Sequence, residues 1–138
     1  MAATTVDRMT PKRLVLGSFP VPCGAVKILK GTLVMLNTSG YAVVGADTAS
    51  NRVLGWAKAQ CDNSAGSAGD KDVIVEFGIA EFAASSIAIT NVGAQMYIVD
   101  NQTFDETTPA NSVKCGILVR CISATKGEIL ILPGGAGV

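Results

Sequence analysis

The chain has 138 residues, of which 49% are hydrophobic, 16% are charged and none is histidine. Its 11 Lys and Arg residues balance its 11 Asp and Glu residues, so no net field gathers a nucleic acid or steers an acidic ligand. The missing histidine excludes Ser-His-Asp and Cys-His catalysis, and the low charge indicates an unusually neutral surface.

A neutral surface of this kind has two interpretations. The first is a soluble domain rich in small, uncharged residues, and the second is a subunit whose surface is largely covered by neighbouring subunits. The length favours one domain with one core. Direct binding of nucleic acid is not expected.

The N-terminal residues MAATTVDRMTPK are small, polar and aperiodic, which predicts a flexible arm over residues 1–13. We predict a single all-β domain over residues 14–133, of the jelly-roll or barrel-like sandwich type, and a flexible Gly-rich tail over residues 134–138. Nine segments rich in β-branched or aromatic residues and bounded by turn residues support this prediction. They are LVLGSF, AVKIL, TLVML, YAVVG, RVLGWAKA, DVIVEFGIAEF, AQMYIV, VKCGILVRCI and EILIL.

Two local patterns sharpen the prediction of strands. Residues 31–43 read as a hairpin, with the turn at Asn37–Gly40 between two apolar runs. In residues 72–82, the alternation of Val73, Val75, Phe77 and Ile79 with more polar positions predicts a half-buried strand with one apolar face. The best helix candidate, AEFAASS, would form only a turn or two.

Two pairs of glycines suggest an internal repeat. Gly31 and Gly93 each open an apolar segment, and the spacing from Gly31 to Gly93 is nearly the same as that from Gly55 to Gly116. Two similar strand-turn-loop-strand units packed in one body would produce this spacing. The alternative is a chance echo, because any β-protein of this composition produces some.

The remaining candidates for catalysis are pairs of carboxylates. Glu76 and Glu81 are an odd number of residues apart, so they lie on opposite faces of a strand, and Asp105–Glu106 lies in a polar loop. We interpret both pairs as solvated structural carboxylates. The sequence therefore predicts that the protein is not an enzyme.

Three glycine-rich segments, at residues 63–71, 125–128 and 133–137, are candidates for phosphate-binding loops. None has the Gly-Lys-Ser/Thr run into a helix that such a loop needs, so we interpret them as a loop, a turn and a tail. No cofactor and no metal are expected.

The cysteines indicate a reducing compartment. They lack zinc-site spacing and are too sparse for a disulfide scaffold, so we expect free, mostly buried thiols. The run LVLGSF is too short for a signal peptide, and residues 82–99 carry too many polar side chains to span a bilayer, so no membrane partner is expected. The cysteines are Cys23, Cys61, Cys115 and Cys121.

The order of these patterns resembles that of the capsid decoration, or cement, proteins of tailed bacteriophages. The resemblance covers most of residues 26–119 and consists of a Gly-led strand, a turn, a "VLG(V)A" strand, a glycine-rich loop and two further strands. Trp56 stands where a small aliphatic residue would be more usual. The segments concerned are VKILKGTLVMLNTSGYAV, ASNRVLGWAKAQCDNSAGSAGDKDVIVEFGIAEF and VGAQMYIVDNQTFDETTPANSVKCGILV.

The resemblance implies an all-β fold with no catalytic residues. It also implies a homodimer or homotrimer on the outer surface of an icosahedral head, made in the bacterial cytoplasm, with the major capsid protein as partner. On this hypothesis Arg8, Lys12 and Arg13 of the arm would meet acidic groups of the shell. Trp56 has two interpretations, a core residue or an anchor in a subunit interface.

Two other functions stay open at this point. A different virion β-protein, such as a tail tube or fibre component, has a similar composition. A small ligand-binding or carrier β-barrel is a different class of protein, but a carrier needs a lysine at a hairpin tip, and the turn at residues 37–40 has none.

Overall fold

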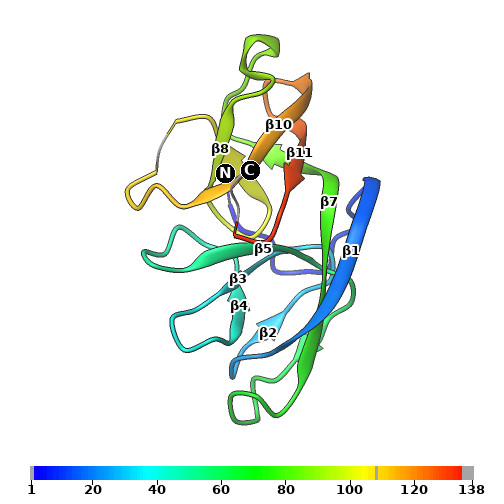
Figure 1. Cartoon of the computed structure of the whole chain (residues 1–138), viewed down its shortest axis with the longest axis vertical. Helices are drawn as coiled ribbons and strands as arrows, with labels where there is room; N and C mark the ends of the chain where they lie inside the picture. The colour runs from blue at the N-terminus through cyan, green and yellow to red at the C-terminus, as the bar shows by residue number, and fades with distance from the viewer. Residues whose placement is uncertain (1, 108, 135–138) are drawn as a thin grey trace.

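The computed structural model describes residues 2–107 and 109–134, and its regular structure is almost entirely β, which confirms the predicted all-β fold (Figure 1). None of the described residues forms a helix long and apolar enough to cross a membrane. The elements are β1 (Lys12–Pro22), β2 (Lys27–Ile28), β3 (Leu33–Leu36), β4 (Ala42–Val44), β5 (Arg52–Ala57), β6 (Cys61–Asp62), β7 (Asp72–Ala84), a 3₁₀ turn η1 (Ile89–Asn91), β8 (Gln95–Ile98), β9 (Thr103–Asp105), β10 (Lys114–Ser123) and β11 (Lys126–Ile131).

The long strand β7 belongs to two rings of strands. Its first half pairs with β5 and β1, and the ring continues through β3 and β4 to a bridge between Ala42 and Cys23, just after β1. Its second half pairs with β11 and β9, and β8 and β10 complete the second ring. We call these rings unit 1 (residues 12–76) and unit 2 (residues 77–131). They are the lower and upper halves of the molecule in Figure 1.

The strand register repeats between the two units. Val34 pairs with Gly55 in unit 1, and Met96 pairs with Gly116 in unit 2, so both strands of the pair recur after nearly equal offsets along the chain. Both strand pairs have a bulge immediately beside the glycine. The parallel contact of Cys23 with Ala42 likewise recurs as that of Ala84 with Phe104. Further matched pairs are Leu36–Ala42 with Ile98–Phe104, Trp56–Glu76 with Ile117–Leu130, and Val21–Val73 with Phe82–Gly127.

This correspondence favours the internal repeat over a chance echo. A chance similarity in glycine spacing would not make equivalent strands pair in the same way in both units. The structure repeats both parallel and antiparallel pairings in the same order. The predicted hairpin at residues 31–43 is confirmed as β3 and β4, with Gly40 at φ +87° in its turn.

The buried face of β7 switches partway along the strand. Val73 and Val75 point into the core of unit 1, whereas Ala80 and Phe82 point into the core of unit 2. Odd and even residues of a strand face opposite sides, so one strand can serve two cores on its two faces. The prediction of a single apolar face was therefore wrong beyond Val75. The strand also extends to Ala84, so the helix candidate at residues 80–86 was wrong.

The two cores are unequal in composition. The core of unit 1 is made by its own strands together with the short pair β2–β6. The core of unit 2 also contains four residues that unit 1 presents on its outer side, so the two units share one continuous apolar cluster there. These four residues are Leu33, Met35, Val53 and Trp56, all fully buried.

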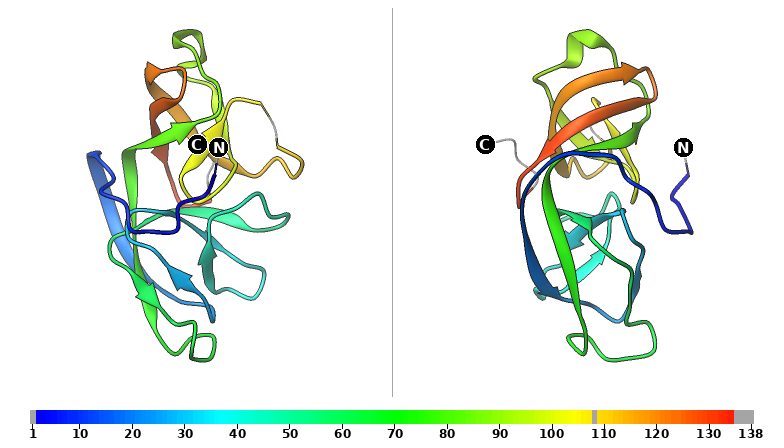
Figure 2. Two further views of the ribbon diagram at one scale, coloured as in Figure 1. Left: turned by 180° about the vertical axis from the view of Figure 1, so that it is seen from behind. Right: turned by 90° about the vertical axis from the view of Figure 1, so that its right-hand side faces the viewer.

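The N-terminal segment crosses the junction of the two units (Figure 2). The backbone of Thr4 exchanges two hydrogen bonds with the side chain of Asn101 in unit 2, and the amide of Arg8 donates to the carbonyl of Lys30 in unit 1. Lys12 and Arg13 already lie in β1, so the body begins earlier than the predicted boundary at residue 14. The predicted flexibility of the arm stays a prediction. Of the predicted tail, residues 135–138 lie outside the described residues.

Candidate partner-binding site

A hollow of about 350 Å³ lies between the N-terminal segment and the ends of β3 and β5. Four of its lining residues are cationic and none is acidic. Apolar surface from Met9, Pro11 and Ala57 completes the wall. The four cationic residues, which we call the basic cluster, are Arg8, Lys12, Lys30 and Lys58.

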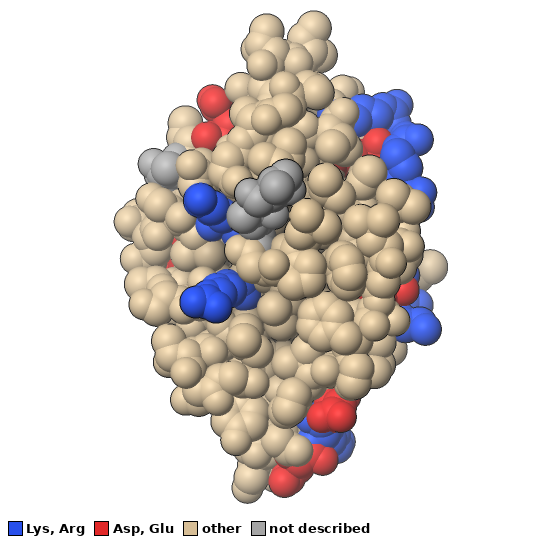
Figure 3. Space-filling view, viewed as in Figure 1, with Lys and Arg blue, Asp and Glu red and all other residues tan. Residues whose placement is uncertain are grey.

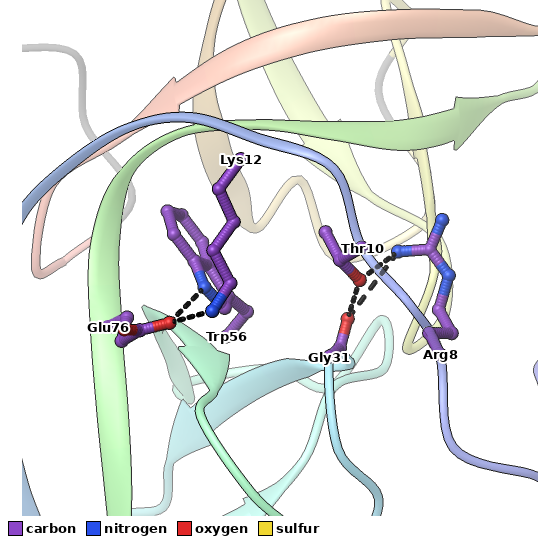
Figure 4. Close-up of polar contacts among 6 residues, drawn as sticks. All are labelled: Arg8, Thr10, Lys12, Gly31, Trp56 and Glu76. Carbon is purple, nitrogen blue, oxygen red and sulfur yellow. Dashed lines mark hydrogen bonds and ion pairs between the residues drawn. The ribbon is translucent and has the colours of Figure 1, made fainter.

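Arg8 is held in place by contacts on both sides of its guanidinium group. The group lies over the ring of Phe82, 4.8 Å from the ring centroid. Its Nη1 donates to the hydroxyl of Thr10 at 2.8 Å and to the carbonyl of Gly31 at 3.4 Å (Figure 4). Partial burial lowers the pKa of Arg8, and the nearby charges of Glu81 and Asp100 oppose this effect. An arginine remains protonated in such a setting, so a positive charge stays at the junction of the units.

Gly31 allows the N-terminal segment to approach this closely. A Cβ at this position would stand 2.4 Å from the carbonyl oxygen of Arg8, and the backbone has φ +74°. The hydroxyl of Thr10 donates to the Gly31 carbonyl at 2.6 Å, which ties the two segments together. The repeat-related Gly93 has no atom within 4 Å of such a Cβ, because no arm crosses it.

Lys12 and Trp56 share one carboxylate. Both donate to Oε1 of Glu76, with Trp56 Nε1 at 3.0 Å (Figure 4). Burial raises the pKa of Glu76, but the hydrogen bonds from Lys12 and Trp56, together with the charges of Lys12 and Lys58, lower it further, so the net shift is downward. Glu76 is only 7% exposed, so the prediction that it is a solvated carboxylate was wrong.

Trp56 lies in the core. None of its surface is accessible in this chain, and its ring packs against that of Phe82 at 6.3 Å between centroids. The structure thus places it as the core interpretation expects, and it offers no surface for a partner.

Arg13 lies in β1 outside the hollow. Its Nε donates to Oε1 of Glu128 at 2.8 Å, and Arg120 approaches the same carboxylate at 3.7 Å. The hydrogen bond to Glu128 raises the pKa of Arg13. Arg13 is therefore engaged within the chain, and the structure does not bring it together with Arg8 and Lys12.

Lys30 and Lys58 are the residues of the hollow that sequence reasoning missed. Both are exposed, and within residues 2–107 and 109–134 neither forms an ion pair. They follow strand segments that lie far apart in the sequence, and no local pattern links them. Their ammonium groups therefore add positive charge to the hollow without a direct ion-pair partner among the described residues, although the charge of Lys58 also acts on Glu76. This arrangement suits a carboxylate with an adjoining apolar group that contacts Met9, which is 86% exposed.

The thiols match their prediction. All four cysteines are free, and Cys23, Cys61 and Cys115 are buried. Burial raises the pKa of Cys115 to about 12, so this thiol is unreactive near neutral pH. Among the described residues, no group of three or more His, Cys, Asp or Glu side chains is placed to hold a metal ion.

Comparison with known proteins gives no assignment. No protein-family model matches the chain, and no match was found among the curated proteins or the solved structures.

Proposed function

We propose that this chain is a virion structural protein, namely a decoration protein that binds the outer surface of a tailed-phage head and stabilises the expanded capsid. Its partners are then the major capsid protein and further copies of itself. The proposal begins from the resemblance in strand and turn order over residues 26–119. The observation that carries it furthest is the N-terminal segment, which crosses both units beside a basic hollow that is open to a partner.

The body of the molecule suits an attachment that must resist force. Because β7 runs through both units, neither can move far without breaking hydrogen bonds of the other. The face shown in Figure 3 carries few charged side chains, so a protein partner can cover it at a small cost in desolvation.

The N-terminal segment suits a contact that forms on the shell. It exposes Val6 and Met9, at 67% and 86%, although both side chains are apolar. Its backbone bonds to the body at Ala2, Thr4, Arg8 and Pro11, so the stretches between these points are free to form contacts with a neighbour. Ordering a free segment costs about 1–2 kcal/mol per residue, and the new contacts must exceed this cost.

The proposed mechanism is thermodynamic linkage. A protein that binds the expanded shell better than its precursor stabilises the expanded form by an amount set by its concentration relative to its Kd. At a hundredfold excess the gain is about 2.7 kcal/mol per site, and it is repeated at every site of the lattice. The pressure of packed DNA is then shared across many subunit joints.

The direct test uses heads of the encoding virus, purified after deletion of this chain. We expect added protein to co-sediment with expanded heads and to raise the temperature at which they release DNA. The double variant Lys30→Glu, Lys58→Glu should bind at least tenfold more weakly if acidic groups enter the hollow.

The matched control is Lys27→Glu, Lys114→Glu, which makes the same change in charge at exposed lysines outside the hollow. It should bind as the parent does. Heads whose rupture temperature does not change on addition of the protein would refute the proposed function. Equal loss of binding in both double variants would refute the role of the hollow but not the proposed function.

A further inference from the structure

One edge of β1 is unpaired over most of its length in the part of the chain that the structure describes. Over residues 12–20 the strand pairs only with β7, and its other edge meets the body only at the bridge between Cys23 and Ala42. In the described part of the chain, β1 is the one strand of more than two residues with such a long open edge. Unpaired N–H and C=O groups along an edge are a template for pairing with another strand.

The middle of this edge is apolar and exposed. Leu14, Val15 and Leu16 follow one another and are 45%, 42% and 50% exposed. Edge strands are commonly protected by charges, prolines or bulges. Here the charges of Lys12 and Arg13 stand at one end and Pro20 at the other, so they leave the middle uncovered, although Arg13 and Leu16 are bulged relative to β7.

The internal repeat shows which kind of strand pairs with the equivalent edge of β7. Residues 73–80 of β7 are equivalent to residues 12–19 of β1, because Phe82 takes the place of Val21 in the matched register. The edge of β7 that carries β9 also carries β1, antiparallel, over residues 72–80. The equivalent edge of β1 carries β4 only at Cys23, so the position that β1 fills on β7 is empty on β1 itself.

We propose that two copies of this chain pair their β1 strands antiparallel, edge to edge, across a two-fold axis near Leu16. In the described part of the chain the other long strands have partners on both edges over at least part of their length, so the longest free edge in a second copy is the same one, and an isologous pair closes both at once. Antiparallel pairing also places Lys12 and Arg13 of the two copies at opposite ends, whereas parallel pairing would align like charges. This inference deepens the homo-oligomer of the proposed function by naming its interface.

The first test is sedimentation equilibrium of the full chain over a wide concentration range. We expect a reversible monomer–dimer equilibrium, and Leu16→Lys should raise the dimer Kd at least tenfold, because it places two charges beside the axis. Ile89→Lys is the matched control, since Ile89 is an apolar residue that is 78% exposed and lies in η1, away from the edge. Thermal unfolding monitors whether both variants fold.

The second test places a cysteine beside the axis. Leu16→Cys should form an intermolecular disulfide under mild oxidation, and Ile89→Cys and the parent should not. A parent that is monomeric at every concentration overturns the proposal, as does a dimer that Leu16→Lys leaves intact or that Ile89→Lys weakens equally. Stabilisation of heads by a strictly monomeric parent would overturn this interface and leave the proposed function standing.

Discussion

Units 1 and 2 have the same strand pairings but use their outer faces in opposite ways. Leu33, Met35 and Trp56 of unit 1 are fully buried against unit 2. Their counterparts are partly exposed, and two of them are polar. The residues inside each ring are apolar in both units, as Val34 and Met96 illustrate. The interior residues are thus apolar in both units, whereas the outer residues are all apolar only where the neighbouring unit covers them. The counterparts are Gln95, Tyr97 and Ile117.

The two units also close their cores differently. In unit 1, the pair β2–β6 contributes Ile28 and Cys61 to the core, and a long connection over residues 58–71 follows β5. In unit 2, the turn between β10 and β11 occupies only residues 124–125, and unit 1 supplies the missing apolar surface. The longer connection in unit 1 thus supplies apolar core residues from the unit itself, whereas unit 2 obtains part of its core from the outer face of unit 1.

The largest expected effect separates the two outer faces. Trp56→Ala should lower the free energy of unfolding by about 3–5 kcal/mol, because it opens a cavity between the units and removes a donor to Glu76. Urea denaturation followed by circular dichroism measures this. The matched variant is Ile117→Ala, at the equivalent but partly exposed position, and its loss should be clearly smaller. Equal losses would contradict the asymmetry between the outer faces.

A second prediction tests what the units share. Gly55 and Gly116 are equivalent, and an added Cβ would stand 2.0 Å from the carbonyl oxygen of Glu76 and 2.4 Å from that of Leu130. Each change to alanine should therefore destabilise by about 1–3 kcal/mol or more, through forced separation of the strands. The melting temperatures of both variants should fall together. Gly93→Ala has open space around its Cβ and φ +90°, so it should lose only about 1–2 kcal/mol. A tolerant Gly116 beside a sensitive Gly55 would weaken the case for a repeat.

The smallest effect concerns a carboxylate that only unit 1 has. Glu76 corresponds to Leu130 in unit 2. Because the pKa of Glu76 is lowered in the folded state from its ordinary value of 4.5, its ionised form stabilises the fold above that pH. This contribution is lost as the pH falls through the lowered folded pKa. Glu76→Gln should therefore cost about 1–2 kcal/mol at pH 7, and the difference from the parent should shrink below about pH 4.5.

Unfolding curves measured from pH 3 to pH 7 give this comparison. Glu81→Gln serves as the control, since that carboxylate is partly exposed and its ion pair with Lys126 is 3.8 Å long. Its effect should be small at every pH. A Glu76→Gln difference that stays constant down to pH 3 would mean that the carboxylate is not stabilised as a charge.

The candidate site was only partly predictable. The N-terminal cations are noticeable because they cluster in the sequence, and Arg8 and Lys12 do line the hollow. Lys30 and Lys58 meet them only because β3 and β5 are antiparallel neighbours in the sheet, so that the start of β3 and the end of β5 lie together beside the arm. Glu76 and Arg13 were misjudged for the same reason, since their partners come from distant strands.

The sequence by itself determined the all-β class, the turn at Asn37–Gly40 and the spacing of the repeat, because alternation and glycine positions are local properties of the chain. Only the tertiary structure decided which face of each strand is buried. In β7 the odd-numbered face is the more apolar one in residues 73–79, yet beyond Val75 the even-numbered residues are buried instead, because the core of unit 2 lies on that side. Whether a residue is buried depends on its neighbours, and for the outer residues of unit 1, such as Leu33 and Trp56, these neighbours come from unit 2.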